Sequence, residues 1–310
     1  MCLHRGSARA GHGVNVPPPW ICLQVLDAAL IHLLSHVLST RDLVMKNNAA
    51  LKKAKEKGAG EDDELPRDQG FTRPKALILL PFRSCALRVI RRLVQLTPGI
   101  QGRADGVGKL ERLESEYALD SEDEEEERRS NQKARKKGTA HPDHQFLFSG
   151  NNDDHFKMGI KLTRAQMSLF AEFYHSDIIV ASPLGLITKL QDSEADFLSS
   201  IEVTLLDGAD VMLMQNWSHV KSVFESLNQQ PGASHEQNLM RVREWYLDGS
   251  AARYRQNIVL SSFPCVEVNA LMRQCSSHAG QAKVQRSSAG VLSLVVPQAS
   301  LPAAVASPEA

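Results

Sequence analysis

The feature that most constrains this fold is a short apolar stretch, residues 201–206, that runs directly into Asp207, Gly208, Ala209 and Asp210. A run of β-branched and leucine side chains of this length is typical of a buried parallel strand. Ligands of open α/β sheets bind at the carboxyl ends of such strands, so both aspartates are expected at a ligand-binding edge. The alternative is that Asp207 and Asp210 only cap the following helix, a common role of aspartate after a strand.

Further apolar runs alternate with helical patterns along the chain. Strands are expected over 75–80, 177–181 and 256–263, in addition to the strand before Asp207. Helices have apolar residues three and four positions apart, and they are expected over 83–94, 163–174, 215–227, 240–252 and 265–276. This alternation predicts an α/β fold in which a parallel sheet is flanked by helices.

The domain predicted from these elements spans residues 71–285. Before it, residues 1–25 are rich in Gly, His and Pro and are expected to form a disordered N-terminal tail. Residues 26–70 are expected to form an amphipathic helix, ending near Lys57, and a charged linker. The final residues, 286–310, carry little charge and are expected to form a disordered C-terminal tail. One domain between two flexible ends is therefore predicted.

An acidic insertion interrupts this domain at about residues 110–140. Residues 122–127 are all acidic, and the basic residues Lys133, Arg135 and Lys137 follow them. Blocks of like charge repel one another and stay solvated, so a flexible insertion is expected here. Its basic end has two interpretations, a localisation signal or a plain solvated loop.

Composition narrows the class of protein. Lys plus Arg and Asp plus Glu number 36 each, so net charge argues neither for nor against a nucleic-acid partner. The five cysteines include no Cys-x-x-Cys pair, which favours a reducing compartment and no zinc site. No apolar run approaches the roughly 20 residues that span a bilayer, and the N-terminus lacks the pattern of a secretory signal. An intracellular protein with no membrane partner is expected.

Two parts of an ATPase site are missing from the sequence. In P-loop ATPases a strand-end Asp helps to hold Mg²⁺ and a neighbouring carboxylate orients the attacking water, whereas Gly208 has no side chain for the second task. The nearest candidate for a phosphate loop is residues 102–110. It has one residue too many between its outer glycines, and Leu110 stands where Ser or Thr should meet Mg²⁺. We therefore expect this segment to be a flexible loop, with no catalytic residue, no metal and no cofactor in the protein.

Four expected strand ends carry short motifs, which in chain order are Pro81-Phe82-Arg83, Ser182-Pro183-Leu184-Gly185, Asp207-Gly208-Ala209-Asp210 and Ser261-Ser262-Phe263. They resemble degraded forms of motifs Ia, Ib, II and III in the first RecA-like domain of DEAD-box helicases. The amino-acid sequence of further stretches (73–75, 81–83, 152–157, 173–186, 196–202 and 214–217) is similar to one family in particular. This is the digestive organ expansion factor family, also called U3 small nucleolar RNA-associated protein 25.

The resemblance covers about residues 26–285 and implies a single, degenerate RecA-like (P-loop NTPase-like) domain without helicase activity. It implies a nuclear, nucleolar protein that acts as a non-catalytic scaffold of the small-subunit processome in U3-dependent pre-rRNA processing and ribosome biogenesis. The implied partners are U3 small nucleolar RNA, pre-rRNA and processome proteins. The chain departs from the family pattern because a second RecA-like domain is missing and because neither 1–25 nor the tail after 286 matches it.

RNA contact is the positive hypothesis that follows from these motifs. In helicases, motifs Ia and Ib hold the sugar-phosphate backbone through side chains, backbone amides and helix N-termini. Arg83, Ser182 and Gly185 occupy the matching positions, and Arg88 is a candidate for supporting charge. The degenerate motif II consists of Asp207, Gly208 and Asp210, and the degenerate motif III of Ser261 and Ser262. The alternative interpretation of the arginines is a solvated helix face.

Other functions remain open at this stage. An ATP-dependent RNA helicase with residual activity would hydrolyse ATP and lose that activity on Asp207→Ala. A protein-only adaptor would use the old RNA face to bind a partner protein. Trp217, Trp245 and Tyr246 lie in amphipathic helical patterns, so we expect them in the core or in an interface rather than stacked on RNA bases.

Overall fold

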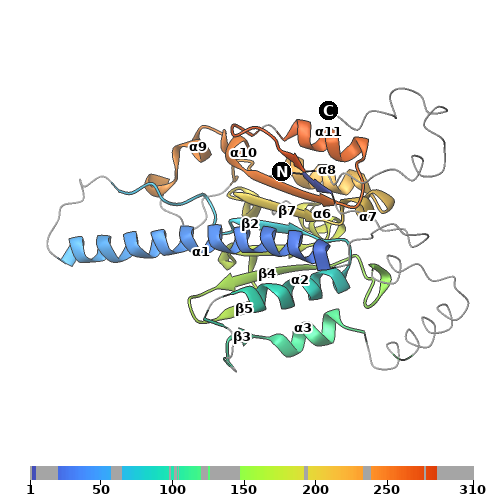
Figure 1. Cartoon of the computed structure of the whole chain (residues 1–310). Helices are drawn as coiled ribbons and strands as arrows, with labels where there is room; N and C mark the ends of the chain where they lie inside the picture. The colour runs from blue at the N-terminus through green and yellow to red at the C-terminus, as the bar shows by residue number, and fades with distance from the viewer. Residues whose placement is uncertain are drawn as a thin grey trace, which may run out of the picture.

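The computed structural model describes residues 2–4, 20–56, 65–97, 99–100, 103, 105–119, 125, 147–191, 195–232, 239–275 and 277–284. The elements in chain order (Figure 1) are β1 (Cys2–His4), α1 (Trp20–Glu56), β2 (Ala76–Leu79), α2 (Arg83–Leu96), β3 (Val107–Gly108), α3 (Leu110–Tyr117), β4 (Lys157–Leu162), β5 (Met167–Ala171), η1 (Phe173–His175), β6 (Ile178–Ala181), α6 (Pro183–Gln191), η2 (Asp196–Leu198), β7 (Val203–Asp207), α7 (Ala209–Met214), α8 (Trp217–Ser226), η3 (Leu239–Arg241), α9 (Glu244–Leu247), α10 (Ala251–Tyr254), β8 (Gln256–Ser261), α11 (Val266–Gln274) and β9 (Lys283–Val284).

The described strands form one sheet in the order β3-β5-β4-β6-β2-β7-β8-β1-β9. Its centre is parallel: β2 pairs with β6 on one side and with β7 on the other, and β7 pairs with β8. β4 runs antiparallel to both of its neighbours, β5 and β6. The predicted α/β fold with a mostly parallel sheet is confirmed, and β4 is the exception that the alternation of strands and helices did not predict.

Helices cover both faces of the sheet (Figure 1), and β2 shows why. Ala76 and Ile78 belong to the apolar cluster that includes α1 and α2, whereas Leu77 and Leu79 belong to the cluster formed with α6, α8 and α11. All four side chains are fully buried. Because successive side chains of a strand point to opposite faces, a strand covered on both sides must be apolar throughout. The continuous apolar runs in the sequence are therefore explained by strands that helices cover on both faces.

α1 is buried along only part of its length. Leu26, Leu30, Leu33 and Val37 form a buried stripe at helical spacing against the sheet. Further along, the helix runs past the edge of the sheet (Figure 1), and most side chains between residues 45 and 56 are exposed. The amphipathic helix predicted after residue 26 is therefore confirmed, although it begins earlier, at Trp20.

The ends of the predicted segments differ from the structure in two places. Cys2–His4 forms β1 beside β8, and α1 begins at Trp20, so residues 1–25 are not a tail throughout. Residues 110–117 form α3 with Leu113 and Tyr117 buried, so the insertion begins later than predicted. Glu125 aside, the acidic part of the insertion and the predicted tail at 286–310 lie outside the described residues.

The helix predicted over residues 163–174 is wrong. Residues 167–171 form β5, which pairs antiparallel with β4 through a turn in which the Thr163 N–H donates to the carbonyl of Gln166. Met167 and Leu169 are fully buried two positions apart, as the period of a strand requires. The apolar residues satisfy both periods, and pairing with β4 decides between them.

The strands predicted over 75–80, 177–181, 201–206 and 256–263 correspond to β2, β6, β7 and β8. Across the described residues, no helix combines the length and the apolarity that crossing a membrane requires. The long helix α1 is instead half-covered by the sheet and half-exposed.

Candidate functional site

The carboxyl ends of four neighbouring parallel strands bring the four motifs to one edge of the sheet. Leu79 of β2 lies opposite Ala181 of β6 and Leu206 of β7, and Asp207 lies opposite Leu260 of β8. The residues that follow these positions are therefore neighbours, although they are far apart in the sequence. This edge is where open α/β sheets bind ligands.

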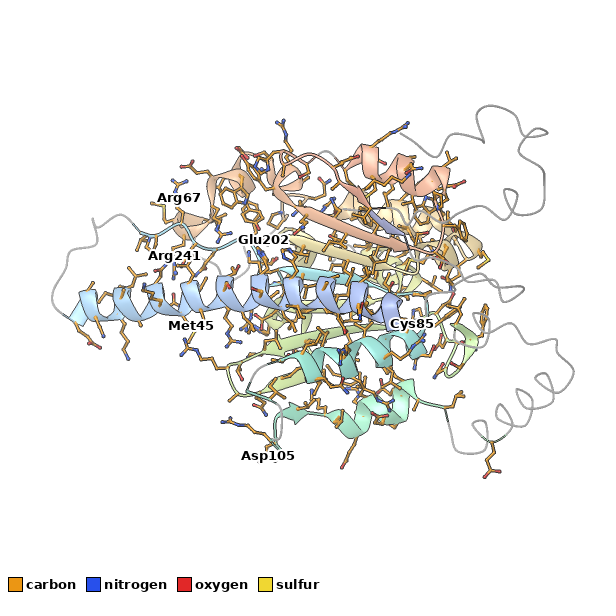
Figure 2. The ribbon with its side chains drawn as sticks, in the orientation of Figure 1. Met45, Arg67, Cys85, Asp105, Glu202 and Arg241 are labelled. Carbon is orange, nitrogen blue, oxygen red and sulfur yellow. The ribbon has the colours of Figure 1, made fainter. Side chains whose placement is uncertain are left out.

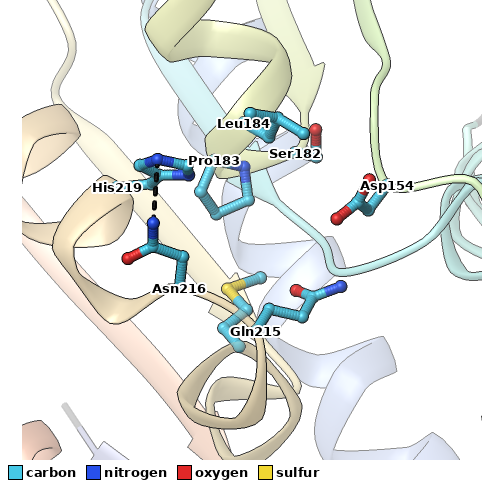
Figure 3. Close-up of a pocket in the computed structure, with 8 residues that line it drawn as sticks. Asp154, Ser182, Pro183, Leu184, Gln215, Asn216 and His219 are labelled. Atoms are coloured by element: carbon cyan, nitrogen blue, oxygen red, sulfur yellow. Dashed lines mark hydrogen bonds between the residues drawn. The ribbon is translucent and has the colours of Figure 1, made fainter.

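A pocket of about 180 Å³ opens at this edge between α6, α7 and α8 (Figure 3). Its described lining consists of Asp154, Ser182, Pro183, Leu184, Met212, Gln215, Asn216 and His219. Asn216 caps α8 by accepting from the Ser218 N–H at 3.1 Å, and its amide nitrogen lies 3.0 Å from His219 Nε2. None of these lining residues is Lys or Arg, so the pocket lacks the cationic side chains that hold a triphosphate.

Asp207 and Gly208 form the junction between β7 and α7. Asp207 is only 6% exposed. Gly208 has φ 75° and is the N-terminal cap of α7. A Cβ at this position would lie 3.4 Å from Pro81, so space alone does not exclude a side chain. The left-handed backbone does disfavour one, because residues other than Gly, Asn and Asp rarely adopt it. Gly208 therefore forms a turn between β7 and α7 that suits glycine.

Asp210 connects the end of β7 to the end of β8. Its Oδ1 accepts a hydrogen bond from the Ser262 N–H at 3.2 Å. Ser261 is fully buried, and its hydroxyl donates to the carbonyl of Phe263 at 2.8 Å. Asp210 is 9% exposed. The fold brings these residues together as predicted at the strand ends, and both of these hydrogen bonds are made to backbone groups.

Arg83 is held in place by other parts of the chain. Its Nη1 donates to the carbonyl of Glu116 at 2.9 Å and its Nη2 to that of His155 at 3.1 Å, and Nη2 lies 2.9 Å from Asp153 Oδ2. The guanidinium also lies over the ring of Tyr117, 5.4 Å from its centroid, and burial raises the pKa of Tyr117 to about 12. Arg83 therefore joins α2 to α3 and to the segment before β4, and its side chain keeps 24% exposure.

Ser182 and Gly185 are buried, which differs from the prediction that they offer a surface to RNA. The Ser182 hydroxyl accepts from the Gly185 N–H at 2.9 Å and so caps α6. A Cβ on Gly185 would lie 2.2 Å from the carbonyl oxygen of Phe156, because that segment crosses directly over the helix. Arg88 is half-buried, and its Nη2 lies 3.1 Å from Cys85 Sγ.

The neighbouring arginines of α2 are also paired within the chain. Arg91 forms an ion pair with Glu114 of α3. Arg92 lies 2.6 Å from Asp27 of α1, and its hydrogen bond to that carboxylate raises the pKa of the guanidinium. These contacts tie α1, α2 and α3 together, so the arginine face of α2 is largely a helix-packing surface.

The described part of the candidate phosphate loop lies far from motif II in the sheet. Val107–Gly108 forms β3, an edge strand separated from β7 by β5, β4, β6 and β2. Lys109 has a left-handed backbone, and its Nζ donates to the carbonyl of Phe170 at 3.1 Å. The expected flexible loop is thus a strand and a helix start over 107–110, whereas Gly102 and Ala104 lie outside the described residues. Within the described part of the chain, no group of His, Cys, Asp and Glu is arranged to hold a metal ion.

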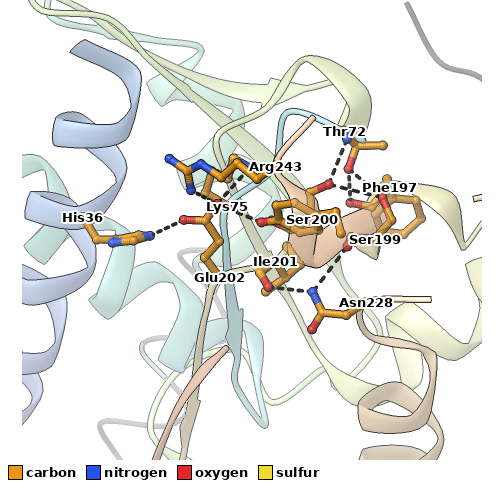
Figure 4. Close-up of polar contacts among 11 residues, drawn as sticks. His36, Thr72, Lys75, Phe197, Ser199, Ser200, Ile201, Glu202, Asn228 and Arg243 are labelled. Atoms are coloured by element: carbon orange, nitrogen blue, oxygen red, sulfur yellow. Dashed lines mark hydrogen bonds and ion pairs between the residues drawn. The ribbon is translucent and has the colours of Figure 1, made fainter. Parts of the chain in front are cut away.

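A second polar cluster, which sequence reasoning missed, surrounds Glu202 (Figure 4). It lies at the opposite edge of the sheet, because Lys75 and Glu202 precede the first residues of β2 and β7. Glu202, just before β7, receives Lys75 Nζ at 3.0 Å and Arg243 Nη1 at 3.1 Å on one oxygen. The Tyr246 hydroxyl donates to the same oxygen at 2.8 Å, and His36 Nε2 lies 2.7 Å from the other. The cluster joins α1, β2, β7 and the segment around the start of α9. A signal was present, because Glu202 interrupts an otherwise apolar stretch.

Electrostatics inside this cluster favours the charged carboxylate. Burial alone would raise the pKa of Glu202, but the charge of Lys75 and the hydrogen bond from His36 outweigh it and hold the pKa below its ordinary value. Burial lowers the pKa of Lys75, against the opposing attraction of Glu202. Burial and the Glu202 charge raise the pKa of Tyr246. A buried carboxylate with this many donors stabilises the junction of four elements.

Comparison with known proteins assigns the domain to a family. A family model described as the NTP hydrolase-like domain of UTP25 matches residues 22–282. The chain belongs to the UTP25 family. Its relatives include Protein NUCLEOLAR FACTOR 1 of Arabidopsis thaliana, 43% identical over 286 residues that cover 87% of this chain and 38% of the relative. U3 small nucleolar RNA-associated protein 25 of Pyricularia oryzae is 41% identical over 84% of this chain and 34% of its own length. That of Podospora anserina is 42% identical over 86% of this chain and 38% of its own length.

Membership of the UTP25 family confirms the resemblance that the motifs indicated. The matched residues, 22–282, take in the described helices from α1, apart from its first two residues, to α11, together with most of the strands. The chain spans 34–38% of the length of these three relatives. What is established for this UTP25-family domain is thus its family and its NTP hydrolase-like α/β fold.

Proposed function

We propose that this chain is a non-catalytic, RNA-associated scaffold of the small-subunit processome that acts in U3-dependent pre-rRNA processing in the nucleolus. The names of its relatives support this: one is called a nucleolar factor, and the others are called U3 small nucleolar RNA-associated proteins. The partners that we propose are U3 small nucleolar RNA, pre-rRNA and processome proteins.

The observation that carries the non-catalytic part is the backbone of Gly208. Hydrolysis of a nucleotide needs a group that orients the attacking water, commonly a carboxylate beside the strand-end Asp. Gly208 stands in that place with φ 75°, a conformation in which a glutamate would be strained. The nearby pocket supports the same conclusion, because no Lys or Arg is among its described lining residues. Asp207 alone supplies neither the water-orienting group nor a phosphate clamp.

RNA contact is proposed at the outer rim of the motif edge. Gln215, Asn216 and His219 are polar lining residues of the pocket, and Arg83 retains partial exposure at the same edge. Such groups donate hydrogen bonds to phosphate and sugar oxygens. Ser182 and Gly185 support this surface without reaching it. The Ser182 hydroxyl caps α6, and Gly185 allows the segment at Phe156 to pack against the start of that helix.

The test is immunoprecipitation of the tagged chain followed by sequencing of the bound RNA. U3 small nucleolar RNA and pre-rRNA are expected to be enriched, and microscopy should place the chain in nucleoli. The double change Gln215→Ala with His219→Ala should reduce the recovered RNA, because it removes two polar side chains from the rim. Lys221→Ala, an exposed change further along α8, is the matched control. Absence of both RNAs from the wild-type precipitate, or a chain found outside the nucleolus, would contradict the proposal.

An ATP-dependent helicase with residual activity is the second candidate, because Asp207 and Asp210 are retained at the strand end. Purified chain should be assayed for ATP turnover with and without RNA. Hydrolysis that disappears in Asp207→Ala would replace the scaffold by the helicase. Recovery of processome proteins without RNA, unchanged by nuclease, would instead favour a protein-only adaptor.

A further inference from the structure

Three aromatic rings form a row on the surface beside α9 and α10. The ring centroids of Trp245 and Tyr254 lie 5.3 Å apart with an interplanar angle of 31°, and those of Tyr254 and His278 lie 4.9 Å apart at 43°. The guanidinium of Arg243 lies 5.2 Å from the Trp245 centroid at the inner end. We call Trp245, Tyr254 and His278 the aromatic row. Trp245 belongs to α9, Tyr254 to α10 and His278 to the segment after α11, and no sequence pattern predicted that the three rings lie together.

The row runs from the buried interior to solvent. At the inner end, Arg243 is 16% exposed and pairs with Glu202, and Tyr246 beside it is buried as predicted. Further out, Trp245 is half-buried, Tyr254 is 50% exposed and His278 is exposed. The backbone N–H of His278 donates to the carbonyl of Arg253 at 3.0 Å, which holds the main chain that carries the outermost ring beside α10. The aromatic row is therefore already ordered in the free chain, and its outermost ring is exposed to solvent.

A basic helix arm belongs to the same end of the molecule. We define the basic arm as residues 45–56 of α1, which carry the exposed lysines Lys46, Lys52, Lys53 and Lys55. None of these four lysines forms an ion pair with another described residue. The arm is fastened through Asn48, whose Oδ1 accepts from Arg241 Nη1 at 2.6 Å. Figure 2 shows Met45 of the arm and Arg241 at the same end of the molecule.

We propose that single-stranded RNA binds this end of the chain, with its phosphates on the basic arm and a base stacked on the outer rings of the aromatic row. Surfaces that bind single strands combine cationic side chains, which follow the backbone, with aromatic rings, on which bases stack. The exposed Leu239 and Met240 lie close by in η3 and would also suit a protein partner. RNA is favoured because lysine is depleted from protein interfaces, whereas the arm presents four exposed lysines.

This surface is distinct from the one under Proposed function. Lys75 and Glu202 precede β2 and β7, so the Glu202 cluster that anchors the row lies at the amino ends of the strands, across the sheet from the motifs. RNA reaching both surfaces would have to pass around the domain. The inference names an additional contact, and it does not depend on which residues of the motif edge touch RNA.

The test measures binding of the whole chain to a fluorescent single-stranded RNA of about ten nucleotides, a usual site size for such surfaces. Lys52→Ala with Lys53→Ala should weaken binding roughly tenfold and reduce the salt slope by about 1.4, since each phosphate contact on a single strand contributes about 0.7. The matched control removes two exposed charges, Lys221 and Arg273, from α8 and α11 on another face. It should leave affinity and slope close to those of the wild type.

The aromatic row has its own pair of variants. Tyr254→Ala should weaken RNA binding roughly tenfold because a stacking ring is lost, whereas Tyr254→Phe keeps the ring and should bind as the wild type does. Thermal melting checks that each variant is folded. Equal losses from the arm and control double changes, or no loss in Tyr254→Ala, would overturn the inference. Loss of binding only in Gln215→Ala with His219→Ala would leave the motif edge as the RNA site and reject this one. A chain that binds no RNA at all would reject both.

Discussion

Asp210 accepts a hydrogen bond from the backbone N–H of Ser262, with 3.2 Å between Oδ1 and the nitrogen. The contact joins the first turn of α7 to the turn after β8, and Asp210 is nearly buried. Two motifs that are weak in the sequence therefore form one structural unit at the edge of the sheet. In this unit the carboxylate shapes the backbone, which is a role that needs no nucleotide.

Replacement of Asp210 tests that role. Asp210→Ala should lower the free energy of unfolding by about 2 kcal/mol, because it removes a charged acceptor from a half-buried N–H. Asp210→Asn keeps an oxygen in the same place and should lose less than about 1 kcal/mol. Urea unfolding with equal m-values measures both. Equal losses in the two variants would show that the hydrogen bond to Ser262 is not the source of the stability.

A glutamate introduced at position 208 should not produce an ATPase. Gly208→Glu and Gly208→Ala should each destabilise the fold by about 1–2 kcal/mol, because a side chain is forced into a left-handed backbone with φ 75°. Neither variant should gain ATP turnover in a coupled assay with RNA. Gly232→Ala is the matched control, since nothing lies within 4 Å of a Cβ there. It should be neutral or slightly stabilising. ATP hydrolysis by Gly208→Glu would contradict the glycine-turn interpretation.

The central strands could be predicted because their constraint is local. Leu77 and Leu79 of β2 are fully buried, and so are the residues that pair with them in β6 and β7, so continuous apolar runs appear in the sequence. Strand β5 could not be predicted in this way, because Met167, Leu169 and Phe170 fit a helix as well as a strand. Only the antiparallel partner β4 separates the two possibilities.

The candidate site was less predictable, because burial there is decided by distant segments. Ser182 and Gly185 follow a strand end, as a ligand-binding turn would, yet the chain at Phe156 covers them. Arg83 meets partners 33 to 72 residues away. The Glu202 cluster spans 166 residues between His36 and its carboxylate. The spacing of the motifs predicts the order of the strand ends, but it does not predict which distant segments cover those ends.

Gly185 provides a test of that crossing. Gly185→Ala should cost about 3 kcal/mol or more, because the new Cβ would meet the Phe156 carbonyl oxygen at 2.2 Å and backbone must move. Thr188→Ala, one turn along α6, removes a methyl group and a hydroxyl that donates to the carbonyl of Gly185 and contacts Lys157 and His155. It forces no new atom into the structure and should cost less than about 1 kcal/mol. Thermal and urea unfolding measure both changes. A Gly185→Ala variant as stable as the wild type would mean that the segment at Phe156 lifts away from α6.

The Glu202 cluster predicts how stability depends on pH. The pKa of Glu202 in the folded chain lies below its ordinary value of 4.5, so the folded state favours the charged carboxylate. Its contribution is complete above about pH 4.5 and is lost as pH falls from there towards the lower pKa of the folded state. Glu202→Gln should cost about 3–5 kcal/mol at neutral pH, because Lys75 and Arg243 lose the carboxylate that compensates their burial. The variant should also lose less stability than the wild type on acidification. Urea unfolding at a series of pH values measures both effects, with Glu172→Gln as the control, since that carboxylate is 85% exposed. A parallel pH dependence in wild type and Glu202→Gln would assign the acid sensitivity to other groups.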